Sequence, residues 1–398
     1  MKIIVAPDSF KGNMSAPVVC SAIEEGILRA DKKAKVYKIP LADGGEGTAR
    51  AVTEAAGGEF VKVTVQGPLG KRIKTEFGLI EKGRVAVLDM ASASGLELLT
   101  RDQLNPMKAT TYGTGELIKA ALDSGAKELI IGIGGSATND GGIGMISALG
   151  FRVLDESGKP VGQGGEALAN IASVDSGGAD KRLKDVSIKV ACDVTNPLLG
   201  PRGASAIFGP QKGATPEMVK ILDAGLGKLG KAWIKAGLAK DVEHPGDGAA
   251  GGVGAALRIC LGAEMESGAM LVMRYAGFFG RLLPRSGQPS GVDLVITGEG
   301  MTDGQTAGGK LCSVVARESR KAKVPAALLS GGLGGDAGAL LASFDYAVSI
   351  SCGQIGLDAM IKDSRRDLSL AAENLIRAIM IGKKLPLRSS QRPPHTSA

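Results

Sequence analysis

The 398-residue sequence is poor in aromatic residues, histidine and cysteine. Aromatic side chains make up 3% of it, so stacking platforms for nucleic-acid bases are scarce and the cores must be aliphatic. His244 and His395 are the only histidines, which leaves little material for a histidine-based catalytic triad. The five cysteines have no CxxC pair or regular spacing, which argues against a disulfide framework or a zinc site. A reducing cytoplasm fits this cysteine usage best.

Long hydrophobic runs and concentrated charge are also missing. No run approaches the ~18 apolar residues that a membrane span needs, and the apolar start at residues 3–5 is too short for a signal peptide, so no membrane partner is expected. The net charge of +7 would be +3 without four basic residues in the last sixteen positions, so no basic face argues for nucleic acid. Pro, Ser and Arg dominate residues 383–398, which predicts a disordered basic tail.

Glycine is abundant, with 60 residues, and one glycine-rich loop follows the apolar run at residues 128–131. That run predicts a buried strand emptying into the loop. Missing Cβ atoms let backbone N–H groups converge on an anion, and the loop adds side-chain oxygens that suit phosphate and Mg²⁺. We therefore predict a phosphate or ATP site formed by Gly134, Gly135, Ser136, Thr138, Asn139, Gly141 and Gly142, with Asp140 as a metal ligand.

Two other interpretations of this loop stand beside the phosphate site. One is a purely structural turn. The other is the dinucleotide fingerprint Gly132-x-Gly134-x-x-Ala137, with Asp155 about 20 residues further on, which would make the protein an NAD(P)-linked hydroxy-acid dehydrogenase. The fingerprint requires a helix to begin at once, whereas residues 139–142 are a turn signal with poor helix formers.

The N-terminal region reads as repeated strand, loop and helix units. Residues 2–6 predict a buried parallel strand, and Ser15 predicts the N-cap of a helix over 18–29 with Pro17 in its first turn. The loop between them therefore lies at the carboxyl end of a strand, where open α/β sheets bind ligands, and it carries Asp8, Ser9 and Lys11. A second unit has a strand at 36–40 and a loop with Asp43.

The sequence pattern changes between residues 60 and 89, where apolar and polar residues alternate. This alternation predicts an antiparallel meander, and we place a domain boundary near residue 66. The chain length also favours two domains. A strand at 187–192 leads to Asp193 and Asn196, and another at 293–297 leads to Asp303. Strands predicted at 324–329 and 346–350 complete the sheet that starts at the N-terminus.

Six segments in one order carry a resemblance to a known family. They are residues 6–12, 42–48, 134–142, 192–198, 208–214 and 297–306, and together they resemble the bacterial type I glycerate kinase family over about residues 1 to 380. Asn13 departs from the family, which usually has Ser there, and the basic tail has no counterpart in it.

The resemblance implies ATP-dependent phosphorylation of D-glycerate to 2-phosphoglycerate or its 3-isomer, with Mg²⁺. It also implies two α/β domains: a discontinuous Rossmann-like parallel-sheet domain of residues 1–65 and 265–382, and an inserted mixed α/β domain of residues 66–264. The active site is then expected in the cleft between them. A homodimer is one oligomeric state left open.

Phosphoryl transfer needs positioning, charge neutralisation and an acceptor for the hydroxyl proton. We expect Ser9, Lys11 and the glycine-rich loop to hold phosphates. We expect Asp43, Asp140 and Asp303 to bind Mg²⁺, and Asp193 or Asp8 to act as the base. Lys212 and Asn196 are the candidates for binding the glycerate carboxylate. A non-catalytic nucleotide-binding regulator is a further alternative, which would bind ATP without turnover.

Overall fold

The protein, analysed as a computed structural model, is built on two main β-sheets. The structure describes residues 1–10, 12–42, 45, 47–283, 291–302, 311–334, 342–351 and 356–385. Its strands are β1 (Lys2–Val5), β2 (Lys35–Lys38), β3 (Glu59–Gln66), β4 (Arg72–Ile80), β5 (Val85–Asp89), β6 (Glu128–Gly132), β7 (Arg152–Leu154), β8 (Ser173–Asp175), β9 (Ser187–Ala191), β10 (Glu264–Glu266), β11 (Leu294–Glu299), β12 (Ala326–Ser330) and β13 (Tyr346–Ser349). Its helices are α1 (Ala16–Ala30), α2 (Thr48–Ala55), α3 (Ala91–Ser94), α4 (Tyr112–Asp123), α5 (Ile143–Ala148), α6 (Ala204–Phe208), α7 (Pro216–Lys235), α8 (Ala249–Leu261), α9 (Gly268–Tyr275), α10 (Phe278–Leu282), α11 (Leu311–Lys321) and α13 (Leu357–Lys384).

The first sheet has five parallel strands in the order β13-β12-β11-β1-β2. It combines strands from the N-terminal and C-terminal parts of the chain, since Ile3 of β1 pairs with Leu294 of β11. Ser15 is the N-cap residue of α1 and Pro17 lies in its first turn, as the sequence predicts. The later strands therefore do complete the sheet that begins at the N-terminus.

The second sheet has six strands in the order β10-β9-β6-β5-β4-β3. β5, β6, β9 and β10 are parallel, whereas β3, β4 and β5 form the predicted antiparallel meander. This combination of a parallel sheet and a mixed sheet confirms the α/β fold class with two α/β domains.

The pairing of β3 bears on where the inserted domain begins. β3 starts at Glu59 and pairs with β4 along its whole length, so it belongs to the six-stranded sheet. A division at residue 66 would separate this edge strand from its sheet. The domain boundaries remain a prediction, and this pairing favours a start before residue 59.

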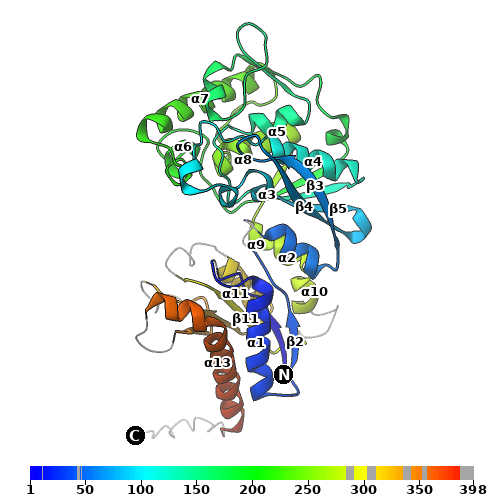
Figure 1. The fold of residues 1–398 in the computed structure, drawn as a ribbon. Helices are drawn as coiled ribbons and strands as arrows, with labels where there is room; N and C mark the ends of the chain where they lie inside the picture. Colours follow the sequence, from blue (N-terminus) through cyan, green and yellow to red (C-terminus); the bar gives the residue numbers. More distant parts are fainter. Residues whose placement is uncertain are drawn as a thin grey trace, which may run out of the picture.

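A shared apolar core joins the two sheets. Ile4 and Val295 of the five-stranded sheet belong to the same buried cluster as Val87 and Ile130 of the six-stranded sheet. Helices α2 and α9 lie between the upper and lower halves of the molecule in Figure 1 and contribute to this cluster. The junction is therefore packed side chain against side chain.

The C-terminal helix α13 packs against α1 on the other face of the five-stranded sheet (Figure 1). It continues to Lys384, so the first two residues of the predicted disordered tail are helical, and residues 386–398 lie outside the described residues. No helix within the described ranges has the combination of length and apolar character that crossing a membrane requires.

Candidate active site

The carboxyl ends of strands from both sheets lie at the junction between the two halves. Asp89, at the end of β5, accepts hydrogen bonds from the amides of Gly47 and Ala49 at the start of α2, at 2.9 and 3.0 Å. Asp193, exposed just after β9, accepts one from the amide of Gly268 at the start of α9, at 3.1 Å. These bonds fix the loop-bearing edge of the six-stranded sheet against segments that lead into and out of the five-stranded sheet.

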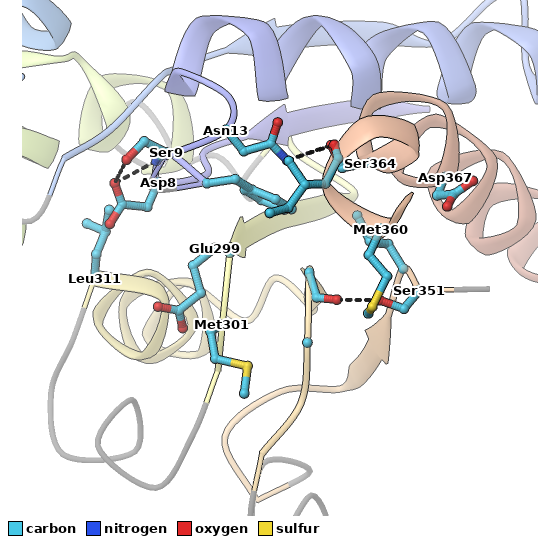
Figure 2. A pocket seen from close by; sticks show the side chains of 16 residues that line it. Asp8, Ser9, Asn13, Glu299, Met301, Leu311, Ser351, Met360, Ser364 and Asp367 are labelled. Carbon is cyan, nitrogen blue, oxygen red and sulfur yellow. Dashed lines mark hydrogen bonds between the residues drawn. The ribbon is translucent and has the colours of Figure 1, made fainter. Parts of the chain in front are cut away.

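A cavity of about 660 Å³ lies at the carboxyl edge of the five-stranded sheet (Figure 2). The chain runs from β1 to β2 in one direction and from β11 through β12 to β13 in the other, so the strand order reverses between β1 and β11. Open α/β sheets bind ligands at such a switch point. The cavity is lined by Asp8, Ser9, Phe10, Asn13, Glu299, Gly300, Met301, Leu311, Gly331, Gly332, Ile350, Ser351, Met360, Ile361, Ser364 and Asp367.

Two carboxylates line this cavity at the ends of β1 and β11. Asp8 accepts a hydrogen bond from the amide of Ser9 at 2.6 Å, and Glu299 accepts one from the hydroxyl of Thr302 at 3.0 Å. Burial raises the pKa of the Cys312 thiol well above its ordinary value, and the charges of Glu299 and Asp8 raise it further. Both carboxylates therefore act on the same small region at the start of α11.

Asn13 connects the loop after β1 to helix α13. Its side-chain amide donates to the hydroxyl of Ser364 at 2.7 Å and to the carbonyl of Ile361 at 3.2 Å (Figure 2 shows the Ser364 bond). Since all three residues line the cavity, this pair of bonds fixes one wall of it.

The glycine-rich loop after β6 is buried over most of its length. Gly141 and Gly142 have φ values of +62° and +77°, and a Cβ there would meet Leu229 and Ala256 at 2.5 and 2.6 Å. Their amides donate to the carbonyl of Gly251 and the carboxylate of Asp140, each at 3.0 Å. These two glycines serve close packing, which argues against the predicted binding of phosphate by their amides.

Asp140 organises this loop from inside. It is fully buried and accepts hydrogen bonds from the amide and hydroxyl of Thr111 at 2.9 and 2.8 Å and from the amides of Gly142 and Gly144 at 3.0 and 3.4 Å. Burial raises the pKa of Asp140, and these hydrogen bonds oppose the rise. With both oxygens used by hydrogen bonds of this region, the geometry favours a structural role for Asp140 over the predicted Mg²⁺ ligand.

Lys212 is a buried cation under the same loop. Its side chain is 1% exposed, and its ammonium donates to the hydroxyl of Ser136 at 2.8 Å and the carbonyl of Thr138 at 2.6 Å. Burial lowers the pKa of Lys212 to about 7, while the charge of Asp140 acts in the opposite direction. Because the ammonium lies beneath the surface, this geometry argues against the predicted direct contact of Lys212 with glycerate.

The other site residues predicted from the sequence are Asn196, Lys11, Asp43 and Asp303. Asn196 is half-buried and donates to the carbonyl of Arg202 at 2.8 Å, within its own loop. Lys11, Asp43 and Asp303 lie outside the described residues. Within the described ranges, no three His, Cys, Asp or Glu side chains are grouped so as to hold a metal ion.

The dinucleotide fingerprint at Gly132 is not followed by the helix that it requires. Helix α5 begins only at Ile143, with Gly142 as its N-cap residue. Asp155 accepts hydrogen bonds from Ser157 and Lys159 in its own turn. The loop geometry therefore argues against the dehydrogenase alternative.

The model of the glycerate kinase family matches residues 3–380. The chain belongs to the glycerate kinase family. Family membership makes it a kinase, supports phosphorylation of glycerate and implies a nucleotide substrate, which removes the dehydrogenase and the non-catalytic regulator as interpretations.

Individual relatives of this glycerate kinase family member cover nearly the whole chain. It is 44% identical to the glycerate kinase of Bacillus subtilis (strain 168), covering 97% of this chain and 99% of that protein. It is 43% identical to the glycerate 2-kinase of Escherichia coli (strain K12), covering 96% and 99%. A crystal structure of a protein named glycerate kinase 2 from Salmonella typhimurium LT2 matches with a TM-score of 0.85 at 43% identity, covering 97% of this chain and 100% of that one.

Sequence reasoning missed several residues that line the cavity of this kinase. Glu299 is the last residue of the buried strand β11, and Asp193 lies two residues beyond β9, so the position of Glu299 at a strand end was a usable signal. Ser364 and Asp367 lie on α13, nearly 70 residues beyond β11, and no local pattern connects them to the cavity.

Proposed function

We propose that this protein transfers the terminal phosphoryl group of ATP to a hydroxyl group of D-glycerate, with Mg²⁺, and that the product is 2-phosphoglycerate. The observation that carries the proposal is the cavity at the switch point between β1 and β11 in a member of the glycerate kinase family. The name of the Escherichia coli relative, glycerate 2-kinase, supports the 2-position over the 3-position.

The nucleotide is proposed to bind in this cavity. Its volume of about 660 Å³ lies within the usual range of ligand pockets. Met301, Leu311, Ile350 and Met360 offer apolar contacts for a purine base, and polar side chains such as Ser351 offer hydrogen bonds. Lys11 follows the lining residue Phe10 and stays our predicted phosphate contact.

The residues at the carboxyl edge of this sheet fit Mg²⁺. Mg²⁺ is usually held by one or two carboxylates together with substrate phosphates and water, so Asp8 and Glu299 form a suitable donor set without a third acid. Asp43 and Asp303 remain predicted ligands. When bound, Mg²⁺ would neutralise charge on the transferred phosphoryl group.

Asp193 is the proposed base that receives the proton of the attacking hydroxyl. It is exposed at the end of β9, and its hydrogen bond from Gly268 orients it without burying it. Asp8 was the other candidate; its place beside Glu299 in the cavity favours the nucleotide and metal instead.

The proposed function is tested by measuring ADP release from MgATP with and without D-glycerate and identifying the product by phosphorus NMR. Glycerate-dependent release with a 2-phosphoglycerate spectrum supports the proposal. A 3-phosphoglycerate spectrum would overturn the regiochemistry alone, and release that ignores D-glycerate would overturn the substrate.

We propose a cytoplasmic location, and the four described cysteines support it because all are free thiols. The homodimer remains a prediction. Light scattering coupled to size-exclusion chromatography would decide it.

A further inference from the structure

The beginning of the glycine-rich loop differs from its buried end. Gly134 is half-buried and Gly135 exposed, and Gly135 has a φ of +72°. The amides of Gly134, Gly135 and Ser136 donate to no acceptor within the described ranges, whereas those of Gly141 and Gly142 are used inside the loop. Successive unused N–H groups that include a left-handed residue form a concave site suited to an anion.

Neighbouring backbone holds these three residues in place. The carbonyl of Gly135 accepts from the amide of Leu96 at 2.9 Å, and the amide of Ala137 donates to the carbonyl of Ser94 at 2.9 Å. The loop is therefore anchored on both sides of Ser136. A site fixed before binding loses less conformational freedom when a ligand arrives.

Lys212 supplies positive charge directly beneath residues 134–136, which form the corner of the glycine-rich loop. Its ammonium contacts the Ser136 hydroxyl at 2.8 Å, and no carboxylate of a described residue forms an ion pair with it. Asp140 is the charged group of the described residues whose field acts on Lys212, and that carboxylate is saturated by the hydrogen bonds of its own loop. A buried cation without an ion-pair partner is costly, so the fold keeps it for a reason other than stability.

Two further polar groups of the same loop have no hydrogen-bond partner among the described residues. The hydroxyl of Thr138 and the side-chain oxygen of Asn139 are both completely buried and unpaired. Such groups lower stability when a fold leaves them unsatisfied. Both residues directly follow the 134–137 segment, and the backbone carbonyl of Thr138 accepts from the Lys212 ammonium, so these unpaired groups belong to the same loop as the exposed amides.

The corner also adjoins the proposed base. Gly132, at the end of β6, is the register partner of Ala191, at the end of β9. Gly134 and Asp193 each follow these paired residues by two positions along parallel strands, so they lie at the same edge of the sheet. An anion bound at residues 134–136 would place the rest of a small substrate near Asp193.

We infer that Gly134, Gly135 and Ser136 bind the carboxylate of the hydroxy-acid substrate, and that Lys212 is a positioning residue that charges this subsite through Ser136. The inference rests on the proposed function for the identity of the substrate. A phosphate oxygen of the nucleotide shares this oxyanion chemistry, but the nucleotide cavity lies on the other sheet.

The test compares Ser136→Ala and Lys212→Met with the control Lys228→Met. Lys228 is an exposed lysine that donates to the carbonyl of Ala169 at 2.6 Å, so its loss removes one lysine and one hydrogen bond away from the site. For each variant, KM is measured for D-glycerate and for ATP, and D-glycerate binding without ATP is measured by calorimetry. Circular dichroism and a thermal melt establish that each variant is folded.

We expect both site variants to raise the KM and the dissociation constant for D-glycerate about tenfold or more, with the KM for ATP changed less than about twofold. The control should match the wild type. Ser136→Ala keeps the result decisive if Lys212→Met does not fold, because it removes only one hydroxyl.

A pH series separates positive charge from packing. The Lys212 side chain loses its proton as pH rises through about 7, so D-glycerate affinity should fall between pH 6.5 and about 8.5 in the wild type and stay level in Lys212→Met. A packing role would leave the two pH profiles parallel and overturn the inference.

The remaining outcomes are distinct. A rise confined to the KM for ATP would assign the anion to the nucleotide and overturn the carboxylate subsite, as would unchanged constants in both variants. If the wild type binds D-glycerate in calorimetry with the expected dependence on Ser136 but releases no ADP, the subsite is supported and the proposed function fails.

Discussion

Among single residues, Asp140 and Lys212 show how one loop uses a buried acid and a buried base differently. Asp140 is satisfied by hydrogen bonds from Thr111, Gly142 and Gly144, so it belongs to the scaffold. Lys212 has two hydrogen bonds and no ion pair within the described residues. Residue type alone did not predict these roles, because an Asp side chain is found in turns, as a metal ligand and as a catalytic base.

The role of Asp140 is tested by Asp140→Asn. The new amide NH₂ would face N–H and O–H donors in place of one carboxylate oxygen, so we expect the free energy of unfolding to fall by about 2–4 kcal/mol in urea denaturation. Asp155→Asn is the matched control, since Asp155 accepts from Ser157 and Lys159 in a surface turn and should change by less than about 1 kcal/mol. Equal stability of Asp140→Asn and wild type would contradict the structural role.

Lys212 should make folding stability depend on pH. Its pKa falls from 10.5 to about 7 on folding because it is buried. Between these values the unfolded chain binds a proton that the folded protein does not, so the free energy of unfolding should rise with pH. We expect urea denaturation at pH 7 and about pH 9 to show this gain in the wild type and its loss in Lys212→Met.

Buried thiols limit the useful range of that experiment. Burial raises the pKa of Cys20 and Cys260 to about 12 from 9.0, so above pH 9 the folded protein keeps protons that the unfolded chain releases. Stability then falls with rising pH. The same pH slope in Lys212→Met and wild type below pH 9 would argue against Lys212 as its source.

The proposed base has a conservative test in Asp193→Asn. Asn keeps an oxygen that can accept from the Gly268 amide but cannot take up the proton of a hydroxyl. Turnover should fall by about 10²–10⁴-fold while the melting temperature stays close to that of the wild type. Near-normal turnover in this variant would remove Asp193 from the reaction.

Between elements, the contact of the β1 loop with α13 shapes the cavity in which we propose that the nucleotide binds. The side-chain amide of Asn13 donates to the carbonyl of Ile361 and the hydroxyl of Ser364 on this helix. Asn13→Ala loses both hydrogen bonds, so we expect a rise of about 2–10-fold in the KM for ATP with the KM for D-glycerate unchanged. Steady-state kinetics with each substrate varied in turn checks this, and equal rises in both constants would count against a local effect.

Much of the element pattern followed from the sequence. Short apolar runs predicted β1, β6, β9, β11 and β12, and alternation predicted the β3–β5 meander, because these signals depend on neighbouring residues alone. The packing role of Gly141 and Gly142 could not be predicted from neighbouring residues. They are small because Leu229 and Ala256, about 90 to 115 residues later, pack against them, and local composition cannot distinguish this from anion binding.

For the whole molecule, the shared core between the two sheets predicts cooperative unfolding. Ile130 is fully buried at this junction and packs in the same cluster as Val295 of the other sheet. Ile130→Ala should lower the free energy of unfolding by about 2–5 kcal/mol. Hydrogen exchange followed by mass spectrometry should show peptides from both sheets exposed at the same denaturant concentration.

An exposed aliphatic residue gives the control for that variant. Ile234 on α7 is 44% exposed, and Ile234→Ala should change stability by less than about 1 kcal/mol. If Ile130→Ala released only the six-stranded sheet, with the five-stranded sheet still protected, the two halves would be independent units.

The pairing of Ile3 with Leu294 also sets an order of events during synthesis. A ribosome adding about 5–20 residues per second needs roughly 15–60 s to reach β11 after it has made β1. During that interval the edge of β1 that pairs with β11 has no partner, whereas all six strands of the other sheet are made before the interval ends. The nascent chain should therefore acquire the loop after β6 well before the cavity at the edge of the five-stranded sheet is complete. A chaperone that shields apolar strands would be needed most at the N-terminus.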